Sequence, residues 1–314
     1  QAMLATMMAT TAGAQQFAIN YTRGNEQEAD NIGMNVLVTA GFDPYAAGEF
    51  FNKLQQQTRY KTKMPAFLVT HPLPDSRVTD ARLRAQQFEK RFFSDSMDFL
   101  LMKARIGARY SERKKDNIAI FEDRVKKSKG NKLFAAQYGL ALSYLDNEKY
   151  RKAEKLLLEL EQLAPENLYL LDTFSDLYIA TKQPEKAEVK LKKAYQLRPN
   201  NSVVTLNYAN VLLANEKEQR AIQLLEYYLL ARPGDYLATQ ILASAYKSAE
   251  NMAKHYSTSA EFYALRSDYR SAIRSVDRAL SVLTKEDKAE ISRLEALKIQ
   301  YRLRQTYIQE IKGA

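Results

Sequence analysis

The stretch from Pro165 to Pro199, PENLYLLDTFSDLYIATKQPEKAEVKLKKAYQLRP, decides the fold because it is one period of an internal repeat. Pro165, Pro199 and Pro233 lie 34 residues apart, and each follows a stretch with helical patterning. Three further columns keep this phase, two of small residues and one of mostly large apolar residues. They are Gly107, Ala141, Ser175, Ala209 and Ala243; Ala119, Ala153, Ala187 and Ala221; and Tyr110, Tyr144, Tyr178, Leu212 and Tyr246. Small side chains let two helices approach closely, so the period predicts a stack of antiparallel helix pairs.

This pattern resembles the tetratricopeptide repeat, and we expect residues 93–314 to form an α-solenoid of that kind. One irregularity is predicted. The segment starting at Tyr269 matches the segment starting at Tyr150 at an offset of 119 residues, which is three and a half periods. We therefore expect one additional helix near residues 236–252. A long amphipathic helix from about Lys285 to Ile311 is expected to close the last apolar face, as the end of a solenoid requires.

Residues 1–92 lack this period and are expected to form a separate helical lobe. A helix that begins before Asp30 should stop at Gly41, which tolerates a left-handed conformation. Asp43 and Pro44 suit the start of a second helix that reaches about Tyr60. A short edge strand is expected at 66–70, and a third helix from Asp75 or Ser76 through Arg91. The uncharged stretch Gln1 to Ala14 is too short and polar to span a membrane, and suits a buried helix, a flap or a surface segment.

Two segments of this lobe carry candidate site residues. Glu26 and Asp30 lie four residues apart, so a helix places both carboxylates on one face. Such pairs usually belong to a solvated helix face. Here, however, a segment containing His71 and Arg77 follows: Thr70-His71-Pro72-Leu73-Pro74-Asp75-Ser76-Arg77.

Together the two segments resemble the second half of the catalytic domain of membrane-associated zinc metallopeptidases, the class that includes the CAAX prenyl proteases. The resemblance implies one zinc ion with Glu26 as ligand, Asp30 as the supporting catalytic carboxylate, and Arg77 beside the site. That class also binds zinc through a His-Glu-x-x-His helix, whose glutamate is the general base. The motif does not occur here, because the sequence has only His71 and His255. We expect the sequence to start inside a longer parent chain that carries the motif upstream.

His71 has two interpretations that the sequence leaves open. It packs or hydrogen-bonds beside the cleft, or it is a regulatory fourth zinc ligand that must move before substrate is cleaved. His255 is expected to be a surface or packing residue near the irregularity in the repeats.

The combination of a metallopeptidase half-site and tetratricopeptide repeats resembles the family of β-barrel assembly-enhancing proteases, over the whole chain. The expected fold is mainly α: the helical C-terminal part of a zincin-type lobe, then an α-solenoid. The resemblance implies a periplasmic zinc endopeptidase and chaperone-like factor that promotes assembly of outer-membrane β-barrel proteins, including the lipopolysaccharide-transport barrel, and degrades misassembled ones. The β-barrel assembly machinery would be a partner of unspecified groove residues within 93–314. The alternative is a non-catalytic repeat adaptor.

Composition narrows the partners. The chain has 314 residues, 46% of them hydrophobic and 27% charged, which indicates a folded protein. It has no cysteine, so disulfides and thiolate metal sites are excluded, and no signal peptide is visible. The net charge of +10 lies entirely in residues 100–314. This basic surface suits acidic partners or anionic envelope lipids with peripheral membrane contact. Nucleic-acid binding is the alternative, but the tyrosine column has core spacing and no nucleic-acid motif is present.

Overall fold

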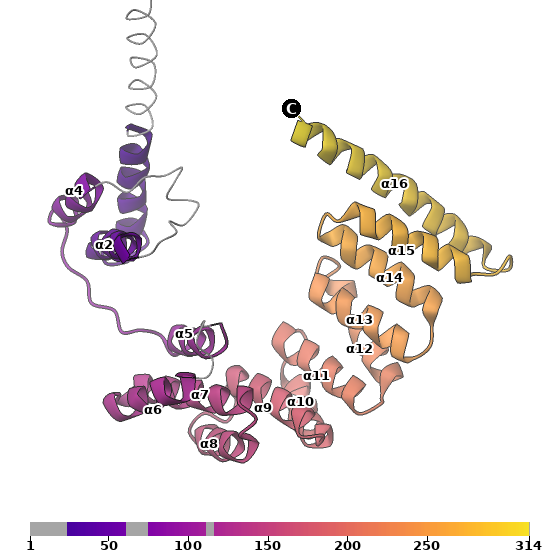
Figure 1. Ribbon diagram of the computed structural model, residues 1–314, viewed down its shortest axis with the longest axis horizontal. Coiled ribbons are helices and arrows are strands. Elements are labelled where there is room, and N and C mark those ends of the chain that lie inside the picture. The colour runs from indigo at the N-terminus through magenta and orange to yellow at the C-terminus, as the bar shows by residue number, and fades with distance from the viewer. Residues whose placement is uncertain (1–23, 61–74, 111–115, 314) are drawn as a thin grey trace, which may run out of the picture. The chain divides into compact units, whose positions relative to one another are not determined.

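The computed structural model describes residues 24–60, 75–110 and 116–313, in which helices are joined by turns and loops with no strand among them. They divide into two compact units, within Gln1–Asp95 and Ser96–Ala314 (Figure 1). The mainly α class is therefore confirmed. The predictions for residues 1–14 and for a strand at 66–70 lie outside the described residues.

The first unit contains a helix over 24–39, α2 (Tyr45–Tyr60) and α4 (Asp75–Ala85). Gly41 ends the first helix with φ of 84°, as its sequence position predicts. The Asp43 side chain then accepts a hydrogen bond of 3.2 Å from the Tyr45 amide at the start of α2. A small apolar core joins the helices and contains Met34, Val78, Ala81 and Ala85.

The third predicted helix is shorter than expected, because α4 ends at Ala85 and not at Arg91. The segment that follows α4 contacts the turn between the first helix and α2. The Arg91 amide lies 3.4 Å from an oxygen of the Asp43 side chain, and its guanidinium lies 3.3 Å from the Val38 carbonyl oxygen. Phe93 contacts Phe42 with ring centroids 6.2 Å apart. These contacts direct the chain across that turn, so α4 does not continue to Arg91.

The second unit is a series of helices that follow one another as hairpins in chain order (Figure 1). They are α5 (Met97–Arg109), α6 (Asn117–Lys127), α7 (Gly130–Asp146), α8 (Tyr150–Leu163), α9 (Leu168–Ala180), α10 (Pro184–Leu197), α11 (Ser202–Ala214), α12 (Glu218–Ala231), α13 (Tyr236–Ser248), α14 (Met252–Leu265), α15 (Tyr269–Val282) and α16 (Lys288–Gly313).

Turn chemistry explains the 34-residue period at both ends of the odd-numbered helices. Asn167, Asn201 and Asp235, which share this spacing, cap α9, α11 and α13 by accepting hydrogen bonds from the first-turn amides. At the opposite ends, left-handed residues with φ of 56° to 59° recur at the same spacing: Glu148, Lys182, Glu216 and Glu250. The residue that follows each left-handed residue donates its amide hydrogen to the carbonyl oxygen five residues before it. An example is the bond of 2.8 Å from the Gln183 amide to the Tyr178 carbonyl. These bonds offset the cost of the left-handed conformation.

The small columns pack as predicted from α7 onward. Ala141, Ala153, Ala187, Ala209 and Ala221 are almost fully buried. The first hairpin departs from the pattern, because Ala119 is exposed and Tyr110 is 77% exposed. The α6 helix instead buries Phe121 against α7, where a Cβ added to Gly139 would lie 2.0 Å from the Phe121 ring. The extension of both columns to Tyr110 and Ala119 was wrong.

The irregularity in the repeats is real but lies one helix later than expected. After Glu250 the next left-handed turn residue is Ser267, only 17 residues on, so the half-period step falls at α14. The apolar core divides there as well. One buried cluster runs from Leu101 to Tyr246, and a second contains Ala260, Ala272, Val276, Ala279, Leu294 and Tyr301. The long last helix is present as α16.

Candidate functional site

Glu26, Asp30 and Arg77 come together in the first unit. The helix over 24–39 supplies both carboxylates from one face, and the first turn of α4 supplies the guanidinium. Arg77 binds Asp30 with two hydrogen bonds, each 2.8 Å long, from Nε to Oδ2 and from Nη2 to Oδ1. Its remaining Nη1 lies 2.7 Å from Oε2 of Glu26. One planar guanidinium therefore fixes the direction of both carboxylates.

The Arg77 guanidinium is shielded on a further side. The Phe51 ring of α2 lies 5.2 Å from it, which is within the range of a cation–π contact. The hydrogen bonds to Asp30 raise the pKa of Arg77 above its ordinary value, and burial opposes that rise. The cluster therefore holds its opposite charges in direct contact and partly shielded from solvent, since the Glu26 and Asp30 side chains are only 13% and 16% exposed.

The rest of α4 is fastened to the same two helices. Arg84 donates to the Asn31 side chain, and Gln55 of α2 donates to the Asp75 side chain. Phe51, Asn31 and Arg84 were not identified as site residues from the sequence, because their partners are distant in the chain. A cavity of about 490 Å³ lies beside Asp30 and has mainly apolar walls, among them Met34, Leu37, Phe50 and Phe51.

The resemblance implies a zinc ion, and the carboxylates of this site suit part of its ligand set. A carboxylate is a suitable zinc ligand, and a second carboxylate can support it. Glu26 and Asp30 fit these two roles by position and burial. Within the described ranges, no three His, Asp or Glu side chains converge as a metal site. His71 lies outside the described residues. The described part of the chain therefore supplies one candidate ligand and its support.

His255 packs as predicted. Its Nδ1 lies 2.7 Å from the Ala243 carbonyl oxygen, and its ring is tilted against Tyr256 at a centroid distance of 5.0 Å. His255 is therefore a packing residue in α14, where the half-period irregularity of the repeats falls.

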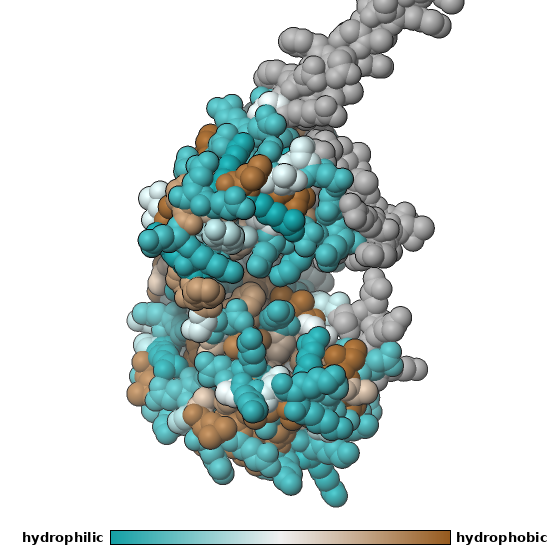
Figure 2. All heavy atoms as spheres, turned by 90° about the vertical axis from the view of Figure 1, so that its left-hand side faces the viewer, coloured by the Kyte–Doolittle hydropathy of each residue, from teal (hydrophilic) through white to brown (hydrophobic). Residues whose placement is uncertain are grey.

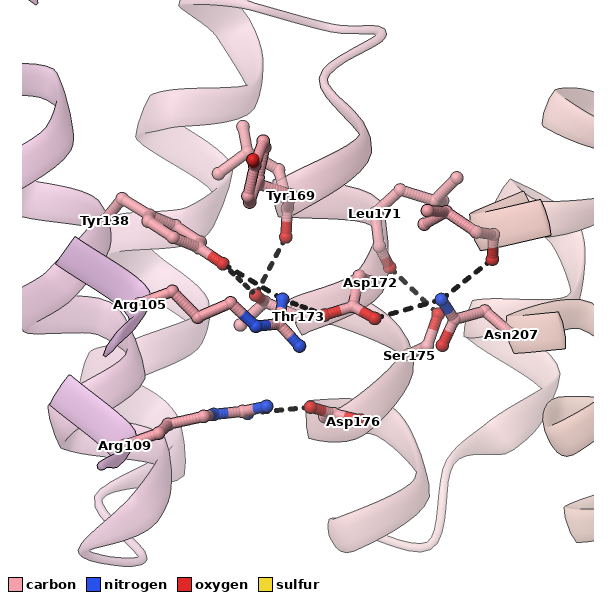
Figure 3. A network of polar contacts seen from close by, with 12 residues as sticks. Arg105, Arg109, Tyr138, Tyr169, Leu171, Asp172, Thr173, Ser175, Asp176 and Asn207 are labelled. Atoms are coloured by element: carbon pink, nitrogen blue, oxygen red, sulfur yellow. Dashed lines mark hydrogen bonds and ion pairs between the residues drawn. The ribbon is translucent and has the colours of Figure 1, made fainter. Parts of the chain in front are cut away.

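A second polar cluster lies in the repeat unit and was not predicted. Figure 3 shows Arg105 and Arg109 of α5 pointing toward Asp172 and Asp176 of α9. Arg105 pairs with Asp172, and Arg109 Nη2 lies 2.7 Å from Asp176 Oδ2. Asp172 also accepts a 3.0 Å bond from Asn207 of α11. Burial lowers the pKa of Arg105, but Asp172 outweighs this effect and the pKa is raised. The signal in the sequence is two pairs at helical spacing of four, which is common and therefore weak.

Two segments of this chain are similar to known families. Residues 1–85 match peptidase family M48, and residues 178–245 match the tetratricopeptide repeat. The chain thus contains one segment similar to M48 peptidases and one similar to tetratricopeptide repeats. The clamped carboxylates lie in the first of these matches, and α9 to α13 overlap the second.

The individual relatives are named for one role. The chain is 42% identical over 177 residues to the beta-barrel assembly-enhancing protease of Yersinia pestis, and 41% identical over 177 residues to that of Escherichia coli K12. These alignments cover 56% of this chain and 36% of each relative. The chain therefore spans about a third of the length of these curated homologues, and the similarity is shorter than the whole-chain resemblance expected. A tetratricopeptide repeat protein from Parabacteroides merdae covers 81% of the chain at 15% identity, with a TM-score of 0.42.

In the part of the chain that the structure describes, no helix is both long and apolar enough to span a bilayer. On the face shown in Figure 2, hydrophobic residues form small groups separated by hydrophilic ones.

Proposed function

We propose that this chain is part of a periplasmic zinc metalloendopeptidase that promotes the assembly of outer-membrane β-barrel proteins and degrades those that misassemble. Similarity to proteins named beta-barrel assembly-enhancing protease supports the role. The observation that carries the proposal is the double clamp of Glu26 and Asp30 by Arg77, with contacts of 2.7 to 2.8 Å. Residues 1–92 would be the C-terminal part of the peptidase domain, and residues 93–314 the partner-binding repeats.

Each residue of the clamp has a distinct role in this proposal. Glu26 would hold the zinc ion together with the two histidines of an upstream His-Glu-x-x-His helix. When bound there, the ion would supply a Lewis acid for the substrate carbonyl and for water. Asp30 would support the site without binding the ion itself, and Arg77 would fix the orientation of the Glu26 and Asp30 carboxylates. The β-barrel assembly machinery and outer-membrane barrels, including the lipopolysaccharide-transport barrel, are the proposed partners of the repeats.

The test is Glu26→Gln in a protein that contains both this chain and the upstream motif. We expect loss of the bound zinc and of proteolysis, because an amide oxygen replaces a negative ligand. Glu28→Gln is the matched control, since Glu28 is exposed two residues away on the same helix. Zinc content by mass spectrometry and cleavage of an unfolded barrel substrate are the measurements. Retention of both by Glu26→Gln would show that the metal assignment is wrong.

For His71 we propose the latch interpretation, in which it occupies the fourth zinc position at rest. We then expect His71→Ala to keep zinc but to increase self-cleavage and substrate degradation. An inactive variant that retains zinc would instead make His71 a direct participant in catalysis.

The second candidate is a non-catalytic adaptor built on the repeats. The extent of the apolar core of the second unit favours it, because that unit needs nothing from the carboxylate cluster to form a binding scaffold. Partner capture that persists at wild-type level in Glu26→Gln, together with absence of zinc from the wild-type protein, would favour the adaptor.

A further inference from the structure

One cavity of the repeat unit has walls from three helices that are not consecutive in sequence. It has a volume of about 640 Å³ and lies between α5, the start of α9 and α11. We call it the α5–α9 pocket. Its apolar walls are Met102, Leu168, Tyr169 and Val203, and its polar walls include Asp98, Arg105 and Asp172. This volume is in the range of the clefts in which proteins bind small ligands, and it is therefore large enough to admit a side chain of a partner.

The pocket is held in shape by the polar cluster of Figure 3. Arg105 of α5 pairs with Asp172 of α9, and Asn207 of α11 donates to the other oxygen of Asp172 at 3.0 Å. The Tyr138 hydroxyl of α7 lies 3.4 Å from Arg105 and 3.3 Å from the Thr173 hydroxyl. These contacts join α5, α7, α9 and α11 in one network that includes the Asp172 carboxylate. A preformed pocket loses little conformational entropy when a ligand enters.

The apolar walls remain accessible. Met102 is 46% exposed and Val203 is 38% exposed, whereas most residues on the inner faces of these helices are buried. An apolar side chain entering the pocket would cover both. Such burial contributes about 25 cal/mol per Å² of apolar surface removed from water.

The charge of the pocket is opposite to that of the chain. Three carboxylates line it, Asp98, Glu166 and Asp172, against the single guanidinium of Arg105. Asp172 is used by Arg105 and Asn207, and Glu166 pairs with Arg198 at 2.5 Å. Within the described residues, the Asp98 carboxylate has no ion pair or hydrogen bond, although the chain carries a net charge of +10.

The start of α9 does not reverse this preference. A helix N-terminus attracts anions through its unpaired amides. Here the Asn167 side chain accepts hydrogen bonds from the Tyr169 amide at 2.9 Å and the Leu170 amide at 3.3 Å. Those two donors are therefore occupied. Asp98 lies in the first turn of α5, whose positive end favours its ionised form, and its carboxylate faces the pocket as a partner for a cation.

We propose that the α5–α9 pocket binds a polypeptide segment that inserts an apolar side chain against Met102 and Val203 and places a lysine or arginine beside Asp98. This inference rests on the proposed role of the repeats as partner-binding elements. It specifies the chemistry of the partner segment, which is apolar and cationic.

Fluorescence anisotropy with the full 314-residue chain tests the proposal. The probes are the fluorescein-labelled peptides Gly-Ser-Lys-Leu-Lys-Ser-Gly, its Glu-Leu-Glu counterpart, and its Lys-Ala-Lys counterpart. We expect the Lys-Leu-Lys peptide to bind roughly two- to fivefold more tightly than the Glu-Leu-Glu peptide, as an exposed charge pair allows. Since the whole chain is basic, nonspecific attraction would give the opposite order. The Lys-Ala-Lys peptide should bind about tenfold more weakly.

Variants locate the binding. Asp98→Lys should invert the order of the lysine and glutamate peptides, and Asp98→Asn should abolish the preference. Met102→Ser should weaken the glutamate and lysine peptides alike, because it removes the apolar wall without adding a charge. Glu159→Lys and Leu158→Ser on α8 make corresponding chemical changes at exposed positions outside the pocket and should leave the order unchanged. Thermal unfolding by circular dichroism identifies any variant that fails to fold.

The proposal is overturned if no peptide binds, if both charges bind equally, or if the α8 variants have the same effect as the pocket variants. Zinc plays no part in this measurement. A failed zinc test of Glu26 therefore leaves the pocket result intact, and a failed peptide test leaves the metal assignment intact.

Discussion

The two units achieve order in different ways. Described residues of the first unit bury few apolar side chains, and their long-range contacts are dominated by charged groups around Arg77. The second unit buries long columns of Ala, Leu and Tyr in two apolar clusters. The difference indicates that polar contacts in the first unit set the direction of individual side chains, whereas apolar contacts in the second set the spacing of whole helices. Substitutions should therefore affect chemistry in one unit and stability in the other.

The largest effect is expected from Arg77→Lys, which keeps the charge but removes the fork that holds two carboxylates. A lysine cannot make the three contacts of 2.7 to 2.8 Å that Arg77 makes with Glu26 and Asp30. We expect zinc affinity in the complete protein to fall about 10- to 100-fold, as is typical of groups that orient metal ligands. Asp30→Asn should have an effect in the same range.

Titration calorimetry of zinc into the metal-stripped protein measures this effect. Arg82→Lys is the control, because Arg82 is exposed on the same helix. Unchanged zinc affinity in Arg77→Lys would mean that the clamp does not serve the metal site.

The second prediction contrasts two alanines that share a sequence column. Ala153 is fully buried between helices, whereas Ala119, one period earlier, is exposed. We expect Ala153→Leu to overpack its hairpin and to lower the free energy of unfolding by about 1 to 3 kcal/mol. Ala119→Leu should change it by less than about 0.5 kcal/mol. Urea denaturation measures both, and similar losses in the two variants would contradict the different packing of the first hairpin.

The smallest effect concerns Glu188, a carboxylate of the repeat unit that is 9% exposed. Burial raises its pKa, but hydrogen bonds from Lys217 and Asn215, both 2.6 Å long, outweigh burial and leave the pKa below its ordinary value. A lowered pKa in the folded state stabilises the fold above the unfolded pKa, about 4.3. That stabilisation is lost as the pH falls through the folded pKa.

Glu188→Gln should therefore cost about 1 to 2 kcal/mol at pH 7, since it weakens charged hydrogen bonds. The difference from wild type should narrow as the pH drops below about 4.3. Glu185→Gln, at an exposed position of the same helix, is the control. A difference that is constant from pH 7 to pH 3 would show that the ionised form of Glu188 is not the stabilising one.

Part of the site could be predicted because its signals are local. Glu26 and Asp30 share a helix face through their spacing alone, and the structure places them 2.7 and 2.8 Å from Arg77. The pairing with Phe51 and the connection of Asn31 to Arg84 could not be predicted, since neither pair is related by a helical period. The ion pairs from α5 to α9 skip α7 entirely, so no repeat column contains them.

The sequence by itself determined the helical class and the 34-residue hairpin, because small residues and turn residues act on their nearest neighbours and recur with the period. It also determined the ends of the helices near Gly41 and Asp43. Only the tertiary structure decided that α4 stops at Ala85, that Phe121 replaces Ala119 in the first hairpin, and that the half-period step falls at α14. Each of these three features depends on contacts with residues that are distant in the sequence. The pattern of apolar residues along one helix shows which face is buried, but it does not specify the element that covers that face.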